Sequence, residues 1–442
     1  MNVVVIGGGV SGLAAAFEAV KGGHTVTLCE PSEIGGMIAT RKVDGFTLED
    51  GPNVLLERAI ISELVDELGL RERVMYPAIE PYEQYVWNNG KPHLVPKTVP
   101  QFLRSELFST ARKLTVPINL FRRSALRTDK DDESVLSFFS RIIGERSTLA
   151  VLDPVLKGIY GGEVTELSAR TLFPQLWEAG KRGTSLLGYM RATGAGGAPK
   201  VFTFRGGIQS LTEALWGRVQ GVVGVVRSPV VALARQSEGR YLLQCEDGSS
   251  LVADRVIVTV AGGRLARIVD GIAPELSRVV GKVEYASLAM AHLAVPDREV
   301  DLRKAFGVLF PGGMKDHLLG VMFKSIVFPD VAPQGQQLLS VVVGGAQAKG
   351  FRPSDEDLQR VVPSLVREFL GVRAPMRWLG ARVWTGAIPQ LKVGHYSVIG
   401  IIDSFEKSFP GVAVCGVDRG GVGVSDRIGA GISAVRRVVN NG

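Results

Sequence analysis

The stretch NVVVIGGGVSGLAAAFEAVKGGHTVTLCE, residues 2–30, decides the fold. It opens with a β-branched run, passes through glycines in GxGxxG spacing into a helical pattern, and ends with a second apolar run that delivers Glu30. Short apolar runs of this kind are typical of strands buried in a parallel sheet. The stretch therefore predicts a strand, a helix and a strand, the first unit of a Rossmann-like α/β domain.

Each residue of this motif has a physical role in holding a pyrophosphate. Gly7 permits a tight turn, Gly9 lets the backbone approach the phosphates, and Gly12 lets the helix pack closely on the strand. The helix N-terminus offers unpaired N–H groups and the positive end of its dipole. Glu30 is placed to accept hydrogen bonds from a ribose, and its charge disfavours NADP. The motif by itself leaves NAD and FAD as alternatives.

The next stretch, IGGMIATRKVDGFTLEDGPN at residues 34–53, favours FAD. It places Gly35-Gly36 directly after the second strand, then Thr40, and then Gly51-Pro52-Asn53. This resembles the extended FAD signature of the flavin amine oxidase and phytoene desaturase group, in which GGRxxT follows the acidic residue. Met37 stands at the position of that group's Arg, so the resemblance implies a phosphate grip made by backbone groups.

The composition is that of a folded protein with more than one domain. The 442 residues suit two or three domains, and 45% hydrophobic with 21% charged residues argues against disorder. Three cysteines, Cys29, Cys245 and Cys415, lack CxxC spacing, which favours reduced thiols in a cytosolic protein. No HExxH or paired-histidine pattern occurs, so we expect no metal site. We see no signal peptide and no apolar run of about 20 residues.

The net charge of +7 is concentrated in residues 91–128. There, basic residues such as Arg122 and Arg123 alternate with apolar ones, and prolines interrupt the segment, which predicts short helices. A basic, apolar, broken helical segment is typical of an element that lies on a membrane surface. A solvated helical subdomain is the alternative. Nucleic acid is disfavoured, because no DNA- or RNA-binding motif accompanies the charge.

The rest of the chain predicts further elements of the same architecture. We expect an acidic capping signal at 129–134 and helices over 135–190. After them we expect a strand, turn and helix at 201–215, followed by a β-meander that returns to the first sheet. Later strands are expected to form a mixed sheet, with an amphipathic helix at 358–371. These strands are 287–295, 306–311, 319–328, 338–344 and 377–385.

Four blocks of sequence resemble the protoporphyrinogen oxidase family, in family order and across almost the whole chain. GIYGGEVTELSARTLFPQL (158–176) resembles the pattern G-[IV]-x-[AG]-G-[DE]-x-x-x-L-S-x-x-x-x-F-P, and FRGGIQSLTEAL (204–215) a second block. AIPQLKVGH (387–395) resembles a third, with Leu391 where Tyr is usual. GGVGVSDRI (420–428) resembles the ending of the family, with Arg427 in place of Cys.

The resemblance implies an activity and a fold. A porphyrinogen would lose six electrons in three hydride transfers to N5 of FAD, which O2 or another acceptor would reoxidise. We assign no catalytic side chain, because the cofactor carries the chemistry. The fold would be α/β, a Rossmann-like two-dinucleotide-binding FAD domain with a mixed-sheet substrate domain and an inserted helical, membrane-associating domain. The domains are predicted at 1–80, 201–280 and 395–442 (FAD), at 81–92 and 281–394 (substrate), and at 93–200 (helical).

The resemblance also implies site residues. Substrate would contact Phe306, Gly307 and Leu309, and Gln84 stands where the family often has a basic residue that pairs with a propionate. Lys91, Lys97, Arg205 or another basic residue is a candidate to replace that basic residue, and an altered substrate is the alternative. The predicted cofactor-binding residues are Gly7, Gly8, Gly9, Val10, Ser11, Gly12, Glu30, Pro31, Gly35, Gly36, Met37, Gly51, Pro52, Asn53, Val54, Val230, Trp384, Val422, Gly423 and Val424.

The C-terminal stretch GVDRGGVGVSDRIGAG, residues 416–431, predicts a second helix N-terminus at the cofactor. We expect a last buried strand at 412–415, a glycine turn, and a helix capped by Ser425 or Asp426. The helix N-terminus would face the polar end of the flavin, where reduced flavin carries negative charge.

The sequence leaves several alternatives open. Protoporphyrinogen IX is the expected substrate, with coproporphyrinogen III as the near rival. Another flavin oxidase, acting on amines or carotenoids, is the second hypothesis, and a flavin-free binding protein like the GDP-dissociation inhibitors is the third. We expect a cytoplasmic protein attached peripherally to the cytoplasmic membrane. An oligomer is compatible with the sequence.

Overall fold

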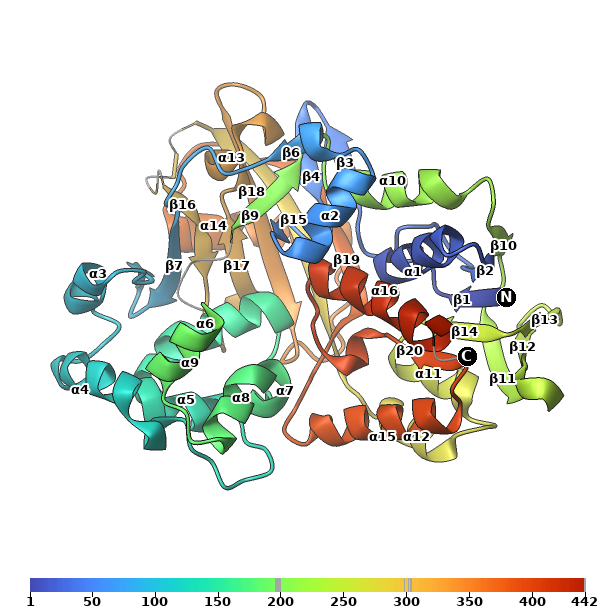
Figure 1. Ribbon diagram of the computed structural model, residues 1–442. Coiled ribbons are helices and arrows are strands. Elements are labelled where there is room, and N and C mark those ends of the chain that lie inside the picture. Colours follow the sequence, from blue (N-terminus) through green and yellow to red (C-terminus); the bar gives the residue numbers. More distant parts are fainter. Residues whose placement is uncertain (195–199, 298, 301, 303, 441–442) are drawn as a thin grey trace.

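A five-stranded parallel sheet holds the N-terminal motif at its centre. The computed structural model describes residues 1–194, 200–297, 299–300, 302 and 304–440 (Figure 1), so parts of the three predicted domains, 195–199, 298, 301, 303 and 441–442, lie outside the described residues. The predicted strand, helix and strand are confirmed as β1 (Asn2–Ile6), α1 (Val10–Lys21) and β2 (Thr25–Cys29). Across the sheet the strands are β10 (Gly224–Val226), β2, β1, β14 (Arg255–Val258) and β20 (Val412–Val414).

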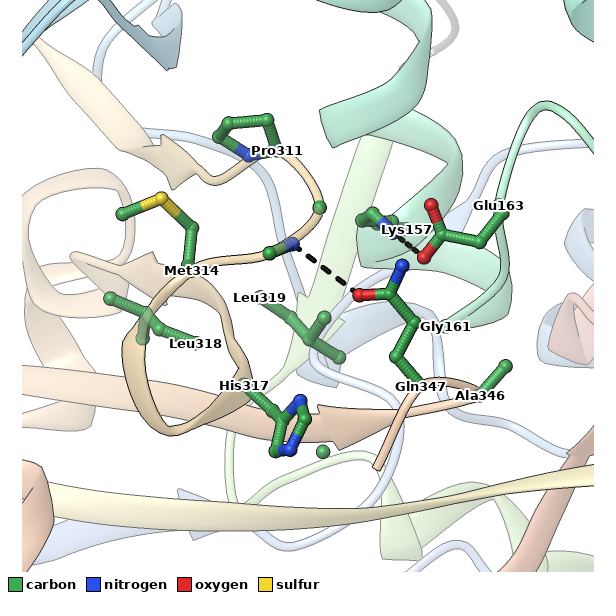
Figure 2. A pocket seen from close by; sticks show the side chains of 13 residues that line it. Lys157, Gly161, Glu163, Pro311, Met314, His317, Leu318, Leu319, Ala346 and Gln347 are labelled. Atoms are coloured by element: carbon green, nitrogen blue, oxygen red, sulfur yellow. Dashed lines mark hydrogen bonds and ion pairs between the residues drawn. The ribbon is translucent and has the colours of Figure 1, made fainter. Parts of the chain in front are cut away.

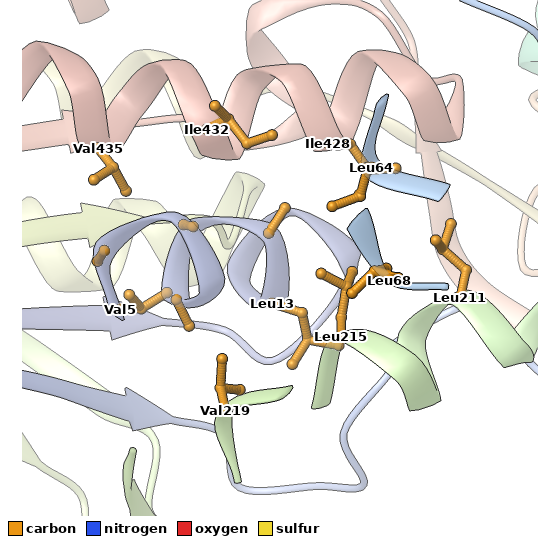
Figure 3. Close-up of a cluster of buried hydrophobic side chains, with 14 of the residues drawn as sticks. Val5, Leu13, Leu64, Leu68, Leu211, Leu215, Val219, Ile428, Ile432 and Val435 are labelled. Atoms are coloured by element: carbon orange, nitrogen blue, oxygen red, sulfur yellow. The ribbon is translucent and has the colours of Figure 1, made fainter. Parts of the chain in front are cut away.

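Each face of this sheet is covered by elements that are far apart in the sequence. Successive side chains of a strand point to opposite faces, so Val3 and Val5 enter one apolar cluster and Val4 and Ile6 another. The first cluster is closed by α1, α10 (Gln209–Val219) and α16 (Val424–Asn440) (Figure 3). The second is closed by the predicted meander, which is confirmed, and by three helices. These elements are β11 (Val230–Arg235), β12 (Tyr241–Cys245), β13 (Ser250–Ala253), α11 (Gly262–Val269), α12 (Pro274–Val280) and α15 (His395–Ser408).

The second large sheet is mixed and has seven strands. Its core packs against α14 (Asp355–Leu370), the predicted amphipathic helix. The neighbours β16 and β7 run parallel, whereas the other neighbouring pairs run antiparallel. The strands in order are β19 (Arg377–Pro389), β15 (Tyr285–Pro296), β18 (Gln336–Gly345), β17 (Leu318–Met322), β16 (Ala305–Leu309), β7 (Glu83–Asn88) and β8 (Lys91–Leu94).

Two predictions in this region are wrong. The expected strand 319–328 ends at Met322 and continues as the short helix α13 (Lys324–Val327), since an apolar run suits a buried strand and a buried helical turn equally well. Residues 91–94, predicted within a broken helical segment, form the edge strand β8, whose partner β7 is set by the turn at Asn89-Gly90, both with positive φ. Strand β8 thus extends beyond residue 92, the predicted end of that part of the substrate domain.

A group of helices lies apart from the five-stranded sheet (Figure 1). Their existence over 135–190 is confirmed, and Ser134 caps α5 by accepting from the Ser137 amide. Pro117 lies inside α4 rather than ending it. In the described part of the chain, no helix has the length and hydropathy needed to cross a bilayer. The helices are α3 (Val99–Arg104), α4 (Thr110–Phe121), α5 (Val135–Ile143), α6 (Glu145–Tyr160), α7 (Ala169–Leu172), α8 (Pro174–Lys181) and α9 (Leu186–Thr193).

Small elements connect the two sheets. A hairpin turns at Asp44-Gly45, both with positive φ. The elements are β3 (Thr40–Val43), β4 (Phe46–Glu49), β5 (Leu55–Leu56), α2 (Ala59–Glu67), β6 (Val74–Met75) and β9 (Val201–Phe204).

Candidate functional site

The glycine loop between β1 and α1 packs as tightly as backbone allows at one end and is open at the other. Gly7 adopts a φ of +105°, and a Cβ on Gly12 would stand 1.8 Å from the Gly7 carbonyl oxygen. A Cβ on Gly9, in contrast, would meet nothing nearer than the Gly36 Cα at 4.0 Å. Gly9 is also the N-cap of α1 and supplies no side-chain oxygen to the first-turn amides. The loop therefore presents an open, donor-rich helix N-terminus, which fits a phosphate.

Glu30 stands directly beside this loop, at the carboxyl end of β2. Its Oε2 accepts from the Gly8 amide at 2.7 Å, and its Oε1 accepts from the Ser32 amide at 2.8 Å. Val230, the first residue of β11, shares an apolar cluster with Cys29 and so lies on the same side. The arrangement places a carboxylate and a buried apolar wall next to the glycine loop, where a ribose and a base would follow a pyrophosphate.

A second glycine turn lies against the first. Gly35 forms a bridge with Gly9, and its amide donates to the Gly8 carbonyl at 2.9 Å. Beyond this turn, Gly51 approaches so closely that a Cβ would be 2.0 Å from the Met37 carbonyl oxygen. Asn53 completes the cradle, because its Nδ2 donates to the Gly51 carbonyl at 3.2 Å while its buried Oδ1 has no partner in the described chain. An orphaned buried acceptor between two glycine turns fits a ligand that carries donors.

The predicted cofactor residues come from six separate places in the chain, residues 7–12, 30–37, 51–54, 230, 384 and 422–424. Most lie in or beside the glycine turns, Trp384 lies in β19, and Val422 and Gly423 lie in the turn before α16. The remaining placements are Val10 and Ser11 in the first turn of α1, Pro31 exposed after Glu30, and Pro52 and Val54 between β4 and β5.

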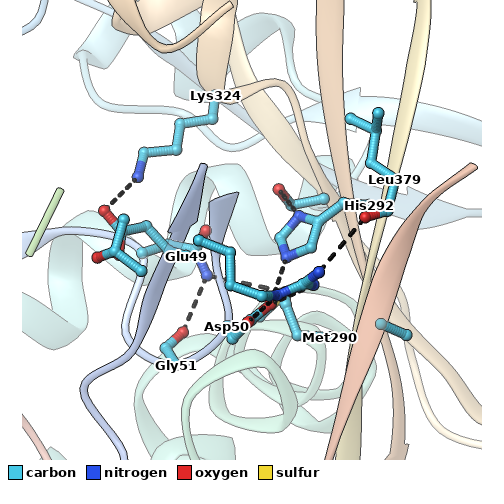
Figure 4. Close-up of polar contacts among 12 residues, drawn as sticks. Glu49, Asp50, Gly51, Met290, His292, Lys324 and Leu379 are labelled. Carbon is cyan, nitrogen blue, oxygen red and sulfur yellow. Dashed lines mark hydrogen bonds and ion pairs between the residues drawn. The ribbon is translucent and has the colours of Figure 1, made fainter. Parts of the chain in front are cut away.

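A buried polar network that was not predicted from the sequence lies behind the Gly51–Asn53 segment (Figure 4). Asp50 accepts from Nε2 of His292 at 3.2 Å and from the guanidinium of Arg41 at 2.8 Å. Burial alone raises the pKa of Asp50, but the hydrogen bonds from His292 and Arg41 outweigh it and bring the pKa down to about 2. Burial lowers the pKa of His292, so its Nδ1 is left to accept from the Ser340 hydroxyl at 3.0 Å.

This network reaches the predicted site through one backbone group. The Asp50 carbonyl accepts from the indole N–H of Trp384 at 2.5 Å, which ties Trp384 to the segment that carries Asn53. Next to it, Lys324 and Glu49 form a fully buried ion pair at 3.2 Å. The one sequence signal was a histidine within the apolar strand AMAHLAV, residues 289–295. A histidine in such a strand indicates that a buried hydrogen-bond partner exists, but the sequence does not identify that partner.

The C-terminal turn is built from Gly420 and Gly421, both with positive φ. The prediction that Ser425 or Asp426 caps the last helix is wrong, because α16 already begins at Val424. The Ser425 hydroxyl donates instead to the Leu56 carbonyl, and Asp426 pairs with Arg58 at 2.5 Å. Both side chains anchor the helix to the neighbouring β5 region, and the turn itself carries the helix N-terminus.

The predicted substrate residues are brought together across two neighbouring strands. Gly307 of β16 pairs with Gln84 of β7, and the ring of Phe306 lies 5.7 Å from the ring of Tyr82. Leu309 contacts α6, since a Cβ on Gly158 would stand 2.7 Å from its Cδ2. The GIYGG motif therefore meets the β16 strand at one place, although 147 residues separate Gly158 from Ala305 in sequence numbering.

A small cavity lies where α6 meets the loop after β16 (Figure 2). Its volume is about 10 Å³, room for one water molecule. Lys157 and Glu163 form an ion pair at its wall, and burial lowers the pKa of Lys157. The Gly312 amide donates to Asp153 at 3.0 Å. These contacts, which sequence reasoning missed, join the helical group to the mixed sheet.

Comparison with known proteins finds similarity over almost the whole chain. The family described as flavin containing amine oxidoreductase matches residues 10–439. The mitochondrial protoporphyrinogen oxidase of Nicotiana tabacum is 29% identical, over 99% of this chain and 95% of the tobacco protein. The coproporphyrinogen III oxidase of Bacillus subtilis is 29% identical, over 98% of this chain and 97% of its own. A crystal structure from Exiguobacterium superposes with a TM-score of 0.81 at 23% identity, covering 100% of this chain and 99% of that one.

Proposed function

The chain belongs to the flavin-containing amine oxidoreductases, and from this membership we propose that it oxidises protoporphyrinogen IX to protoporphyrin IX with FAD. It is a flavin-dependent oxidoreductase with the flavin amine oxidase fold, so a flavin-free binding protein is no longer a candidate. The observation that supports the substrate is full-length similarity to protoporphyrinogen oxidases, together with the contact between Leu309 and Gly158 of the GIYGG motif.

FAD is the form of flavin that the cradle suits best. The open space at Gly9 would take the pyrophosphate, and the carboxylate of Glu30 would accept from the ribose. The unpartnered Oδ1 of Asn53 would accept from a hydrogen-bond donor of the cofactor. FAD, when bound, supplies the hydride acceptor. The chain's own contribution is to hold the cofactor with backbone groups and to keep the reacting atoms away from water.

One basic residue stands out as the partner of a substrate carboxylate. Of the three sequence candidates, Lys91 pairs with Glu106 at 2.8 Å, and Arg205 lies 3.8 Å from Asp330. Lys97 forms no ion pair with a described residue.

The position of Lys97 suits the same role. Its Nζ donates to the Tyr82 carbonyl at 2.8 Å and stands 4.3 Å from the centre of the Tyr82 ring, which in turn contacts Phe306. We assign to Lys97 the role of pairing with a substrate propionate, a role that the uncharged Gln84 cannot fill. An unpaired ammonium beside an aromatic wall is suited to a propionate.

Coproporphyrinogen III is the second candidate substrate. It carries two more carboxylates than protoporphyrinogen IX, and the Bacillus relative is named for it. The purified protein should show the visible absorbance of oxidised flavin and should produce a fluorescent porphyrin from one of the two porphyrinogens. A colourless protein argues against the cofactor, whereas a yellow protein that acts on neither porphyrinogen argues against the substrate alone. Assays with and without O2 identify the acceptor.

We further propose that the protein attaches peripherally to the cytoplasmic membrane through α3 and α4. Leu114, Ile118 and Phe121 lie on one face of α4 at helical spacing, and Leu114 and Phe121 are 69% and 68% exposed. Arg122 and Arg123 follow directly and are exposed. An apolar helix face with adjoining guanidinium groups suits an anionic bilayer surface.

A further inference from the structure

Arg427 is a buried cation at the start of the last helix. The residue is 8% exposed, although it lies only one turn into α16. Its Nη1 donates to the Cys415 carbonyl at 3.0 Å and its Nη2 to the Gly420 carbonyl at 2.5 Å. The Nε is buried and has no partner in the described chain. The guanidinium therefore joins the end of the β20 strand region to the first glycine of the turn.

No carboxylate of the described residues forms an ion pair with Arg427. The neighbouring Asp426 is taken by Arg58, and Asp418 accepts from the Gly262 amide at 2.7 Å and from the Tyr285 hydroxyl. Both aspartates interact with Arg427 only at longer range. The nearby Arg419, in contrast, contacts two carboxylates, Asp403 and Glu406.

A buried charge without a counterion is costly, and burial lowers the pKa of Arg427 accordingly. Such a charge is retained where an anion is present for part of the working cycle. The turn that Arg427 holds lies within residues 416–423, the segment that the sequence predicts to lie at the polar end of the flavin. Reduction of a neutral flavin by hydride adds two electrons and one proton, so the flavin gains one negative charge while the donor loses the hydride.

We propose that Arg427 is a fixed positive charge that stabilises the reduced, anionic flavin and so raises the reduction potential of the cofactor. Its charge adds to the partial positive charge of the α16 N-terminus, which would also stabilise a negative charge on the flavin. In a region with little water, a charge that needs no reorganisation acts strongly on a neighbouring anion. The proposal rests on the flavin part of the proposed function and is independent of which substrate is oxidised.

The test is a spectroelectrochemical titration of the bound flavin without any porphyrinogen. Arg427→Gln and Arg427→Met remove the charge, Arg427→Lys retains it, and Arg436→Gln is the matched control on the same helix. Arg436 is exposed and pairs with Glu18 at the surface. We expect both neutral variants to shift the two-electron equilibrium about tenfold towards oxidised flavin, a potential lower by about 30 mV. The Lys variant and the control should keep the wild-type potential.

Flavin content and thermal unfolding are measured on the same samples. Neutral variants that lose stability but keep the wild-type potential would show a purely structural clamp and overturn the proposal. An equal fall of potential in Arg427→Lys and in the neutral variants would overturn it too, because charge would not be the cause. If one neutral variant does not fold, the other and the Lys variant decide the outcome.

Discussion

Gly431 of α16 lies so close to Ser11 of α1 that a Cβ on Gly431 would stand 2.2 Å from the Ser11 carbonyl oxygen. The last helix of the chain therefore rests on the backbone of the first, directly behind the glycine loop. Gly429, two positions earlier in the same helix, has no atom within 4 Å of its would-be Cβ.

This pair of glycines predicts opposite effects of the same substitution. Gly431→Ala should lower the free energy of unfolding by about 2–3 kcal/mol through overpacking. Gly429→Ala should raise it by about 0.5–1 kcal/mol, because alanine is the better helix former. Urea denaturation of both variants checks this. Equal effects at the two positions would show that the close helix contact is absent in solution.

The glycine loop separates folding from cofactor binding. Gly12→Ala should destabilise the protein by about 3 kcal/mol, since its Cβ would overlap the Gly7 carbonyl. Gly9→Ala should change the stability of the apoprotein by less than about 1 kcal/mol, because its Cβ meets only open space. The same variant should weaken FAD binding about tenfold or more by filling the pyrophosphate position. Chemical denaturation of apoprotein and titration with FAD measure the two quantities, and unchanged affinity in Gly9→Ala would contradict the assignment.

Lys97 should act on substrate binding rather than on the chemical step. Lys97→Met should raise KM about tenfold and leave kcat within about twofold, as expected for the loss of one charge-assisted contact. Lys91→Met is the control, because Lys91 is engaged by Glu106. Steady-state fluorescence assays with both porphyrinogens supply the numbers. A large fall in kcat without a change in KM would contradict the proposal that Lys97 binds a substrate carboxylate.

The α4 surface should bind anionic vesicles in a salt-dependent way. Charge reversal of Arg122 and Arg123 should remove about 2 kcal/mol of attraction, about a thirtyfold loss in partitioning at low salt. Reversal of Arg360 and Arg373, which lie exposed in and after α14, is the matched control. Vesicle sedimentation with phosphatidylserine and with phosphatidylcholine alone measures the effect. Equal binding of wild type and the Arg122/Arg123 variant would exclude this surface.

Asp50 gives the stability a defined pH dependence. The pKa of Asp50 in the folded protein is about 2, below the unfolded value of about 3.9, so its contribution is nearly complete above about pH 5 and is lost as the pH falls through 2. The difference in unfolding free energy between wild type and Asp50→Asn should therefore shrink by about 2 kcal/mol from pH 5 to pH 2. The exposed Asp44, paired with Arg377, provides the control Asp44→Asn. A difference that stays constant with pH would contradict the role of the network.

The parts of the fold that depend on local spacing could be predicted from the sequence, and those that depend on distant partners could not. The strand, helix and strand around Gly7 and Gly12 follow from neighbouring residues whose roles are fixed by backbone geometry. The pairing of His292 with Asp50 joins positions 242 apart, and nothing local distinguishes it. Likewise, Lys97 was one of three equal candidates until the structure showed that the other two are engaged. The site residues themselves stay predictions, because their roles concern molecules outside the chain.

The central position of β1 has a consequence for biosynthesis. Strand β1 has β2 on one side, but its other neighbour, β14, is made some 250 residues later, and α16, which packs against α1, is made later still. At about 5–20 residues per second, the opening glycine loop waits at least roughly 20 s on the ribosome for the segments that complete it. The nascent N-terminal unit therefore exposes an apolar strand edge until β14 has been made. We therefore expect the complete cofactor site to form only after α16 has been made and has packed on α1.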